Sequence, residues 1–167
     1  DIAKTFIYAY VLNAGIPKIA SILSTTAPIA SAARDNFENS IAGLKQFKNE
    51  VLPDIVRKGF FTGYDGRLVH VPNLHKTLAG ILQNAEKVIM AHSKVRWTKQ
   101  LRADMINFKP VGFIHDENQT EVIGTYEEAV HVKEVQMKSI VDVGVDLGFL
   151  TPLAASGKIG KNWSQTH

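Results

Sequence analysis

Residues 111–123 read VGFIHDENQTEVI, and this stretch decides the fold. Residues 111–114 form an apolar run that predicts a strand, and residues 119–123 predict a second strand that returns beside it. The polar residues between them, His115-Asp116-Glu117-Asn118, predict a tight turn. Because the apolar residues of both strands need a covering layer, the hairpin indicates a small antiparallel sheet packed on helices.

Helical patterns lie on both sides of this hairpin. Downstream, Thr125 and Glu128 form a capping box that begins a helix ending near Leu147. Upstream, Asn73 can cap a long helix over residues 73–103. The buried face of that helix is predicted to consist of Leu74, Leu78, Ile81, Leu82, Ala85, Val88 and Ile89. The members expected to lie against the hairpin are Leu78, Ile81, Leu82, Ala85 and Ile89.

A second hairpin is predicted nearer the N-terminus. Residues 60–64 and 67–71 have the composition of two strands, and Asp65-Gly66 between them is a good hairpin turn because Gly tolerates positive φ. Pro72 ends the second strand, since it has no N–H to donate to a ladder.

The N-terminal third is helical in pattern. Apolar residues recur at helical spacing in residues 3–14, where one stripe is formed by Ala3, Ile7, Val11 and Ala14. Further helical patterns cover residues 16–23 and 28–58, with an interruption expected near Pro53. The fold class is therefore α+β, with long helices packed on a small antiparallel sheet.

Composition sets limits on function. The 167 residues carry a net charge of +3 and contain no cysteine. The small positive excess permits nucleic-acid binding without requiring it, and the lack of cysteine excludes disulfides and thiolate metal sites. No segment is apolar enough to span a bilayer and no secretory signal is present, so we expect no membrane partner and a cytoplasmic location. The chain opens inside a helical pattern without an initiator Met, so we expect a fragment.

The strongest chemical signal is His115-Asp116-Glu117 in the predicted turn. Adjacent carboxylates repel each other, and a hard cation such as Mg²⁺ relieves the repulsion through oxygen ligands. Phosphoryl-transfer sites use metal ions in this way. An exposed acidic turn also explains these residues and is the commoner case for a short motif, because Asp and Asn are common in turns. The tripeptide alone leaves both interpretations open.

Two weaker signals point to nucleotides and nucleic acid. Lys4 can hold a triphosphate, and the ring of Tyr8, one helical turn on, can stack on a base. Arg67 can contact a phosphate and Gln83 a base edge. Each pair is also explained by a solvated surface. Four other histidines show no repeated metal-ligand spacing and are expected to be surface or packing residues: His70, His75, His92 and His131.

Four segments stand in an informative order along the chain: residues 3–8 (AKTFIY), 63–83 (GYDGR, then His75 and Leu82-Gln83), 113–117 (FIHDE) and 160–167 (GKNWSQTH). They resemble motif B, the following palm region, motif C and the terminus of family A DNA polymerases of the phage replicase type. The resemblance implies a C-terminal fingers/palm fragment. Residues 1–60 would be partial fingers helices and residues 61–167 the C-terminal palm region.

The resemblance also implies roles for individual residues. Lys4 would bind the incoming triphosphate and Tyr8 would stack on the incoming nucleotide. Asp116 would be a metal ligand and Glu117 a supporting carboxylate, which makes Lys4, Asp116 and Glu117 the catalytic groups. The expected DNA-binding residues are Arg67 on the backbone, Gln83 in the minor groove and His115 near the primer terminus.

The same resemblance implies cofactors and partners. The cofactor would be Mg²⁺ in a two-metal site that is incomplete in this chain, because the motif A Asp, the Arg that opens motif B, and the thumb are absent. The partners would be primer–template DNA, a dNTP and the missing N-terminal part of the polymerase. For a phage-encoded protein the location would be the host cytoplasm.

Three positions depart from the family pattern. Leu12 stands where the family usually has Tyr, Asn13 where it has Gly, and Ala79 where it has Asn. These departures keep an alternative open, a non-catalytic nucleic-acid-binding or structural module derived from a polymerase. If the polymerase interpretation is right, Asp116 must lie at the tip of the 111–123 hairpin, with Gln83, Lys4 and Tyr8 facing the same cleft.

Overall fold

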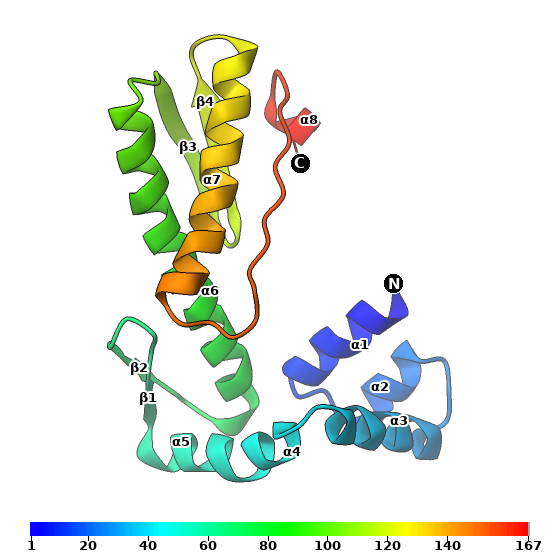
Figure 1. Ribbon diagram of the computed structural model, residues 1–167. Helices are drawn as coiled ribbons and strands as arrows, with labels where there is room; N and C mark the ends of the chain where they lie inside the picture. Colours follow the sequence, from blue (N-terminus) through cyan, green and yellow to red (C-terminus); the bar gives the residue numbers. More distant parts are fainter. Residues whose placement is uncertain (167) are drawn as a thin grey trace. The chain divides into compact units, whose positions relative to one another are not determined.

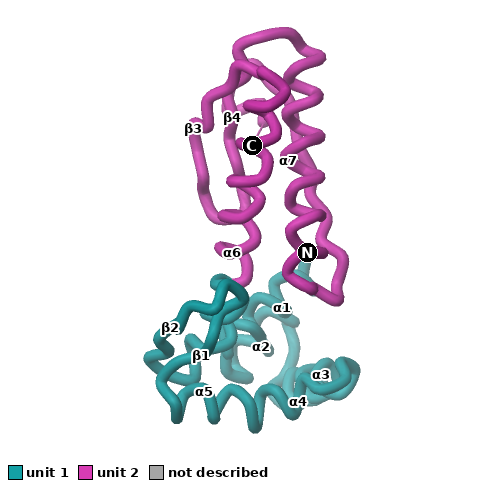
Figure 2. The backbone as a smooth tube through the Cα atoms, turned by 60° about the vertical axis from the view of Figure 1, so that its left-hand side comes forward, with its two compact units in different colours: residues 1–84 teal, residues 85–167 magenta. Residues whose placement is uncertain are grey.

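The computed structural model describes residues 1–166 and divides the chain into two compact units. Unit 1 comprises Asp1–Asn84 and unit 2 comprises Ala85–His167 (Figure 2). His167, the last residue of the segment that resembles a replicase terminus, lies outside the described residues.

Helices make up most of unit 1. Residues 16–23 were predicted to be helical, which α2 confirms, but the interruption of the next helical stretch falls at residues 41–43 and not near Pro53. Pro53 lies in the first turn of α5, directly after a π-helical turn that accommodates its missing N–H, so the helix continues through it. The helical elements are α1 (Ile2–Val11), α2 (Ile16–Ile22), α3 (Ala27–Ser40), α4 (Leu44–Gln46), η1 (Phe47–Val51) and α5 (Leu52–Lys58).

The core of unit 1 forms between α1, α2 and α3. Phe6, Ile19 and Ala30 are buried together, and the Phe6 ring meets the edge of Phe37 at 5.4 Å between centroids. The predicted apolar stripe of α1 is therefore wrong in part, because Ile7 is 43% exposed while Phe6 and Tyr10 are buried. The larger aromatic side chains remove more apolar surface from water, so they determine which face of α1 turns inward.

The first predicted hairpin is confirmed with shorter strands. Strand β1 (Phe60–Thr62) pairs antiparallel with β2 (Leu68–His70), and Phe61 lies opposite Val69. The turn between them needs Gly66, whose φ of +79° is left-handed. Helix α6 (Leu74–Ala103) follows, and the Asn73 side chain accepts a hydrogen bond from the Lys76 N–H, as a capping residue does.

Unit 2 contains the second predicted hairpin between two helices. Strand β3 (Phe108–Ile114) pairs antiparallel with β4 (Glu117–Val122), and a bulge shifts the register between Pro110 and Gly112. Helix α7 (Tyr126–Asp146) begins at the predicted capping box, in which Thr125 and Glu128 exchange hydrogen bonds. The tail then runs back along α7 to a short helix, α8 (Trp163–Thr166) (Figure 1).

The core of unit 2 joins α6, α7 and the β3–β4 hairpin. Trp97 and Leu101 of α6 are fully buried against Val132 of α7 and against Phe108 and Val122 of the hairpin. The predicted buried face of α6 is wrong in part, because Leu74 and Leu82 are 42% and 48% exposed, whereas Val88 and Ile89 are buried as predicted. The cluster against the hairpin uses residues further along the helix. Helical spacing shows which residues share a face, whereas the turn that meets the hairpin is set by tertiary packing.

The α+β fold class is confirmed, with helices packed on small antiparallel sheets. The strands form two separate two-stranded sheets, β1–β2 in unit 1 and β3–β4 in unit 2. Among the described residues, no helix combines the length and the apolar character that crossing a membrane requires.

Candidate functional site

The β3–β4 turn carries the predicted carboxylates. His115 and Asp116 are the two turn residues, since Ile114 is paired with Glu117 across the hairpin. The predicted four-residue turn is therefore too long, and Glu117 and Asn118 are the first residues of β4. His115 has φ +52°, a left-handed conformation that costs a non-glycine residue about 1–2 kcal/mol. The short turn places Asp116 at the tip of the hairpin, as predicted.

The two carboxylates differ in their surroundings. Asp116 is exposed in the turn, whereas Glu117 is partly buried and its Oε1 accepts a hydrogen bond from the Gln119 side-chain amide. Carboxylate oxygens are the ligands that Mg²⁺ prefers. Within residues 1–166, no group of three or more acidic or imidazole side chains is arranged to hold a metal ion. Asp116 and Glu117 therefore fit part of a magnesium site and need further ligands to complete it.

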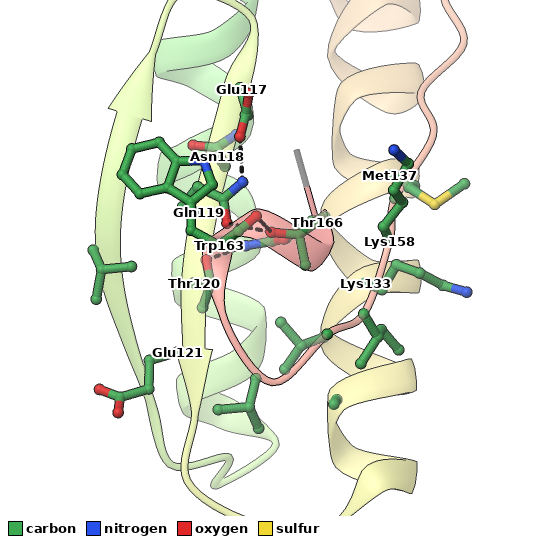
Figure 3. A pocket seen from close by; sticks show the side chains of 18 of the residues that line it. Glu117, Asn118, Gln119, Thr120, Glu121, Lys133, Met137, Lys158, Trp163 and Thr166 are labelled. Carbon is green, nitrogen blue, oxygen red and sulfur yellow. Dashed lines mark hydrogen bonds between the residues drawn. The ribbon is translucent and has the colours of Figure 1, made fainter.

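A groove of about 1000 Å³ lies beside these carboxylates in unit 2. It is bounded by β4, α7 and the tail (Figure 3). Asp116 and Glu117 are among its lining residues. Two hydrogen bonds join its walls: Gln136 of α7 donates to Thr120 at 2.7 Å, and Thr166 of α8 donates to Gln119 at 3.3 Å. Sequence analysis missed these polar groups because no short motif marks a contact between distant segments.

Lys4 and Tyr8 lie together on the exposed side of α1. The Lys4 ammonium is 5.7 Å from the centre of the Tyr8 ring, and Tyr8 is 58% exposed. Tyr10, two residues on, lies on the opposite side and is 7% exposed, and burial beside Glu38 raises its pKa to about 12. The buried Tyr10 thus fixes the rotation of α1 that leaves Lys4 and Tyr8 accessible to a ligand.

Arg67 is held by its own turn. Its Nε lies 2.5 Å from Oδ2 of Asp65, and the guanidinium side chain is 73% exposed. Partial burial raises the pKa of Asp65, but the hydrogen bonds from Arg67 outweigh it and the net pKa is lowered. The pair keeps Asp65 ionised and leaves other N–H groups of Arg67 facing solvent, where a phosphate could meet them.

The departures from the family pattern gather around Gln83 in unit 1. A hollow of about 320 Å³ is lined by Leu12, Ala79 and the exposed Gln83, together with apolar residues of the β1–β2 hairpin. The third departure, Asn13, lies 3.0 Å from Nδ1 of His75, on the same helix as Ala79 and Gln83. The adjacent Leu12 and Asn13 thus belong to one neighbourhood with Ala79, which is distant from them in the sequence.

The predicted site residues fall into two groups. Unit 1 holds Lys4, Tyr8, Arg67 and Gln83, and unit 2 holds His115, Asp116 and Glu117. Within unit 1 the structure brings Lys4 to Tyr8, and within unit 2 it brings Asp116 next to Glu117. Their convergence in one cleft, and the role of each residue, stay predictions.

No protein-family model matches the chain. The DNA-directed DNA polymerase of Escherichia phage Phieco32 is 30% identical over the whole chain, and the polymerases of Enterobacteria phage T3 and Escherichia phage T7 are 28% and 27% identical. The chain spans 26–28% of the length of these relatives.

A solved structure has the same fold. The POL domain of Pol1 from M. smegmatis, determined in complex with DNA primer-template and dNTP, has a TM-score of 0.74. It is 14% identical, and the match covers 85% of this chain and 27% of that one. The resemblance indicated by the sequence motifs is therefore confirmed: the chain is similar, over its whole length, to a segment of the phage-type, family A DNA polymerases.

Proposed function

We propose that the chain supplies part of the active site of a DNA-directed DNA polymerase, which transfers nucleotides under the direction of a template by a two-metal mechanism. The observation that carries this proposal is the position of Asp116 in a two-residue hairpin turn with Glu117 beside it. The similarity of the whole chain to phage DNA polymerases supports it.

The chemistry follows from the charges. Asp116 would hold Mg²⁺ directly, and Glu117 would support the site as a second carboxylate. When bound, the metal ions neutralise charge on the reacting phosphate oxygens. Lys4 would hold the triphosphate as a point charge, and the exposed Tyr8 ring would stack on the incoming base or sugar. The 5.7 Å between the Lys4 ammonium and the Tyr8 ring suits one nucleotide contacting both.

DNA would be contacted by residues of both units. Arg67 would neutralise a backbone phosphate, Gln83 would contact a base edge in the minor groove, and His115 would lie near the primer terminus. The M. smegmatis domain of the same fold was determined with DNA primer-template and dNTP, which supports these two partners. A location in the host cytoplasm stays an expectation.

We further propose that the chain does not extend a primer alone. Asp116 and Glu117 provide too few ligands for two metal ions, and a further carboxylate must come from another segment. The test is primer extension with Mg²⁺ and dNTPs, by the chain alone and mixed with the complementary segment of a phage relative. Extension by the mixture that is lost in D116N supports the proposal, whereas extension by the chain alone contradicts it.

One observation favours a second candidate, a non-catalytic nucleic-acid-binding or structural module derived from a polymerase. Leu12 and Ala79 both replace polar residues of the family pattern, and both line the hollow beside Gln83. An apolar hollow can bind a nucleic acid without any role for the carboxylates. This candidate predicts that the chain binds DNA, that the mixture does not extend a primer, and that D116N leaves DNA binding unchanged.

A further inference from the structure

Gln119 contacts the Glu117 carboxylate from within the same strand. The two residues are two positions apart on β4, so their side chains lie on the same face of the strand. The Gln119 amide nitrogen donates a hydrogen bond to Oε1 of Glu117. A carboxylate only accepts hydrogen bonds, so the NH₂ end of the amide must be the end that faces Glu117.

The oxygen end of the same amide is held by the tail. Because the amide group is rigid, its oxygen points away from Glu117 and needs a donor. The Thr166 hydroxyl lies 3.3 Å from this oxygen and 3.0 Å from the backbone oxygen of Trp163, so its one proton is available to both acceptors (Figure 3). The bonds therefore run in one direction, from Thr166 through Gln119 to Glu117.

The opposite strand restricts Gln119 further. Gly112 of β3 is its cross-strand partner, and a Cβ added to Gly112 would lie only 3.2 Å from the Cβ of Gln119. The glycine thus leaves just enough room for the Gln119 side chain at its base. With its base confined by β3 and its amide bonded at both ends, Gln119 has little freedom to reorient.

We propose that Gln119 is a positioning residue, which holds the Glu117 carboxylate in one orientation, and that Thr166 fixes the direction of the Gln119 amide. The inference rests on the proposed function, because it takes Glu117 as a supporting carboxylate of the metal site. Side chains that orient a ligand from behind improve metal binding because they reduce the rotamer freedom lost when the ion binds. The α8 tail would then contribute to the metal site without touching the ion.

The first test measures the hydrogen bonds from Thr166 to Gln119 and from Gln119 to Glu117, without metal, by NMR of the full chain. The variants are T166V, which removes the hydroxyl, and T166S, which keeps it. The expected result is that T166V shifts the Gln119 side-chain N–H resonances and the Glu117 carboxyl carbon resonance, and that T166S restores both. T151V makes the same change at an exposed threonine of unit 2 and is expected to leave both resonances unchanged. Wild-type resonances in T166V would overturn the proposal.

The second test measures metal positioning through Mn²⁺-induced broadening of backbone resonances around residues 115–119. Q119M removes the amide at similar length, and T166V removes the hydroxyl that orients the amide. Both variants are expected to weaken Mn²⁺ binding, Q119M by about tenfold. D116N and E117Q report on the proposed function separately. Loss of Mn²⁺ binding in these two but not in Q119M or T166V would overturn only the positioning role. Unchanged binding in D116N and E117Q would overturn the proposed metal site together with the inference that rests on it.

Discussion

The imidazole Nε2 of His131 lies 2.8 Å from Oδ2 of Asp104. This pair ties the first turns of α7 to the segment that follows the end of α6, next to the buried Trp97 cluster of unit 2. The hydrogen bond from His131 lowers the pKa of Asp104, with a smaller contribution from Gln100. The ionised carboxylate is therefore the form that the folded unit favours.

The first prediction concerns acid stability. Because the folded state lowers the pKa of Asp104, its contribution to stability is fully present above the ordinary Asp value, roughly 3.9, and is lost as the pH falls through and below that value. We expect D104N to reduce the loss of stability between about pH 5 and pH 3. Urea unfolding over this range measures it, with E134Q, an exposed carboxylate of α7, as the control. Equal pH dependence in wild type and D104N would contradict the prediction.

The second prediction concerns the capping box of α7. Thr125 accepts a hydrogen bond from the Glu128 N–H at 3.2 Å, and the Glu128 carboxylate accepts one from the Thr125 N–H at 2.7 Å. Since T125A removes an N-cap side chain, we expect it to destabilise the chain by about 1 kcal/mol. The measurement is urea unfolding, and T151A is the matched control. A loss in T125A no larger than in the control would show that the cap contributes little.

These local signals show how much could be predicted from the sequence. Asp65-Gly66 and Thr125 act through backbone groups a few residues away, so their turn and cap were visible in the sequence. The predicted turn around His115 was too long. A two-residue turn here needs positive φ at His115, which is uncommon for a residue other than Gly, so the sequence did not show that Glu117 and Asn118 already belong to β4. The position of Asp116 at the tip of the hairpin was predictable, because it depended only on two apolar runs with a polar segment between them.

Contacts between distant segments could not be predicted in the same way. Trp97 is fully buried against the hairpin, whereas Leu82 of the same helix is exposed. The positions of the two residues in the sequence pattern of α6 do not show this difference. The bond from Thr166 to Gln119 joins residues that are 47 positions apart. Motifs record residue types at fixed spacing, whereas these partners are chosen by the folded packing. For this reason the carboxylates were identified from the sequence, whereas the Gln119–Thr166 contact behind Glu117 was not.

The third prediction concerns metal binding. Asp116 and Glu117 offer oxygen ligands but not a full set, so the chain should bind Mg²⁺ weakly, and D116N should abolish what binding there is. Isothermal titration and Mn²⁺ broadening measure this, with E121Q as the control, because Glu121 lines the same groove. Tight Mg²⁺ binding that is lost in D116N would show that the chain holds a more complete site.

The fourth prediction concerns DNA. If Arg67 neutralises one phosphate, the log–log slope of primer–template affinity against salt should become shallower by about 0.9 in R67A. The matched control is R57A, which removes an exposed arginine of unit 1 that is also paired with a neighbouring aspartate. Fluorescence anisotropy at several salt concentrations gives both slopes. An unchanged slope in R67A, or an equal change in R57A, would remove Arg67 from the DNA interface.

The last prediction concerns the hollow that Leu12 and Ala79 line together. L12Y and A79N restore the usual family residues one at a time, and the double variant restores both. Because the two side chains share one hollow of about 320 Å³, the larger residues must compete for its space or contact each other. We therefore expect their effects on primer–template affinity to be non-additive by at least about 0.5 kcal/mol.

The control cycle combines A79N with I29Y, a substitution at an exposed residue of α3 that does not line the hollow. The effects of these two substitutions on affinity should be additive within about 0.5 kcal/mol. Additive effects in both cycles would show that Leu12 and Ala79 affect primer–template affinity independently, and would contradict the prediction.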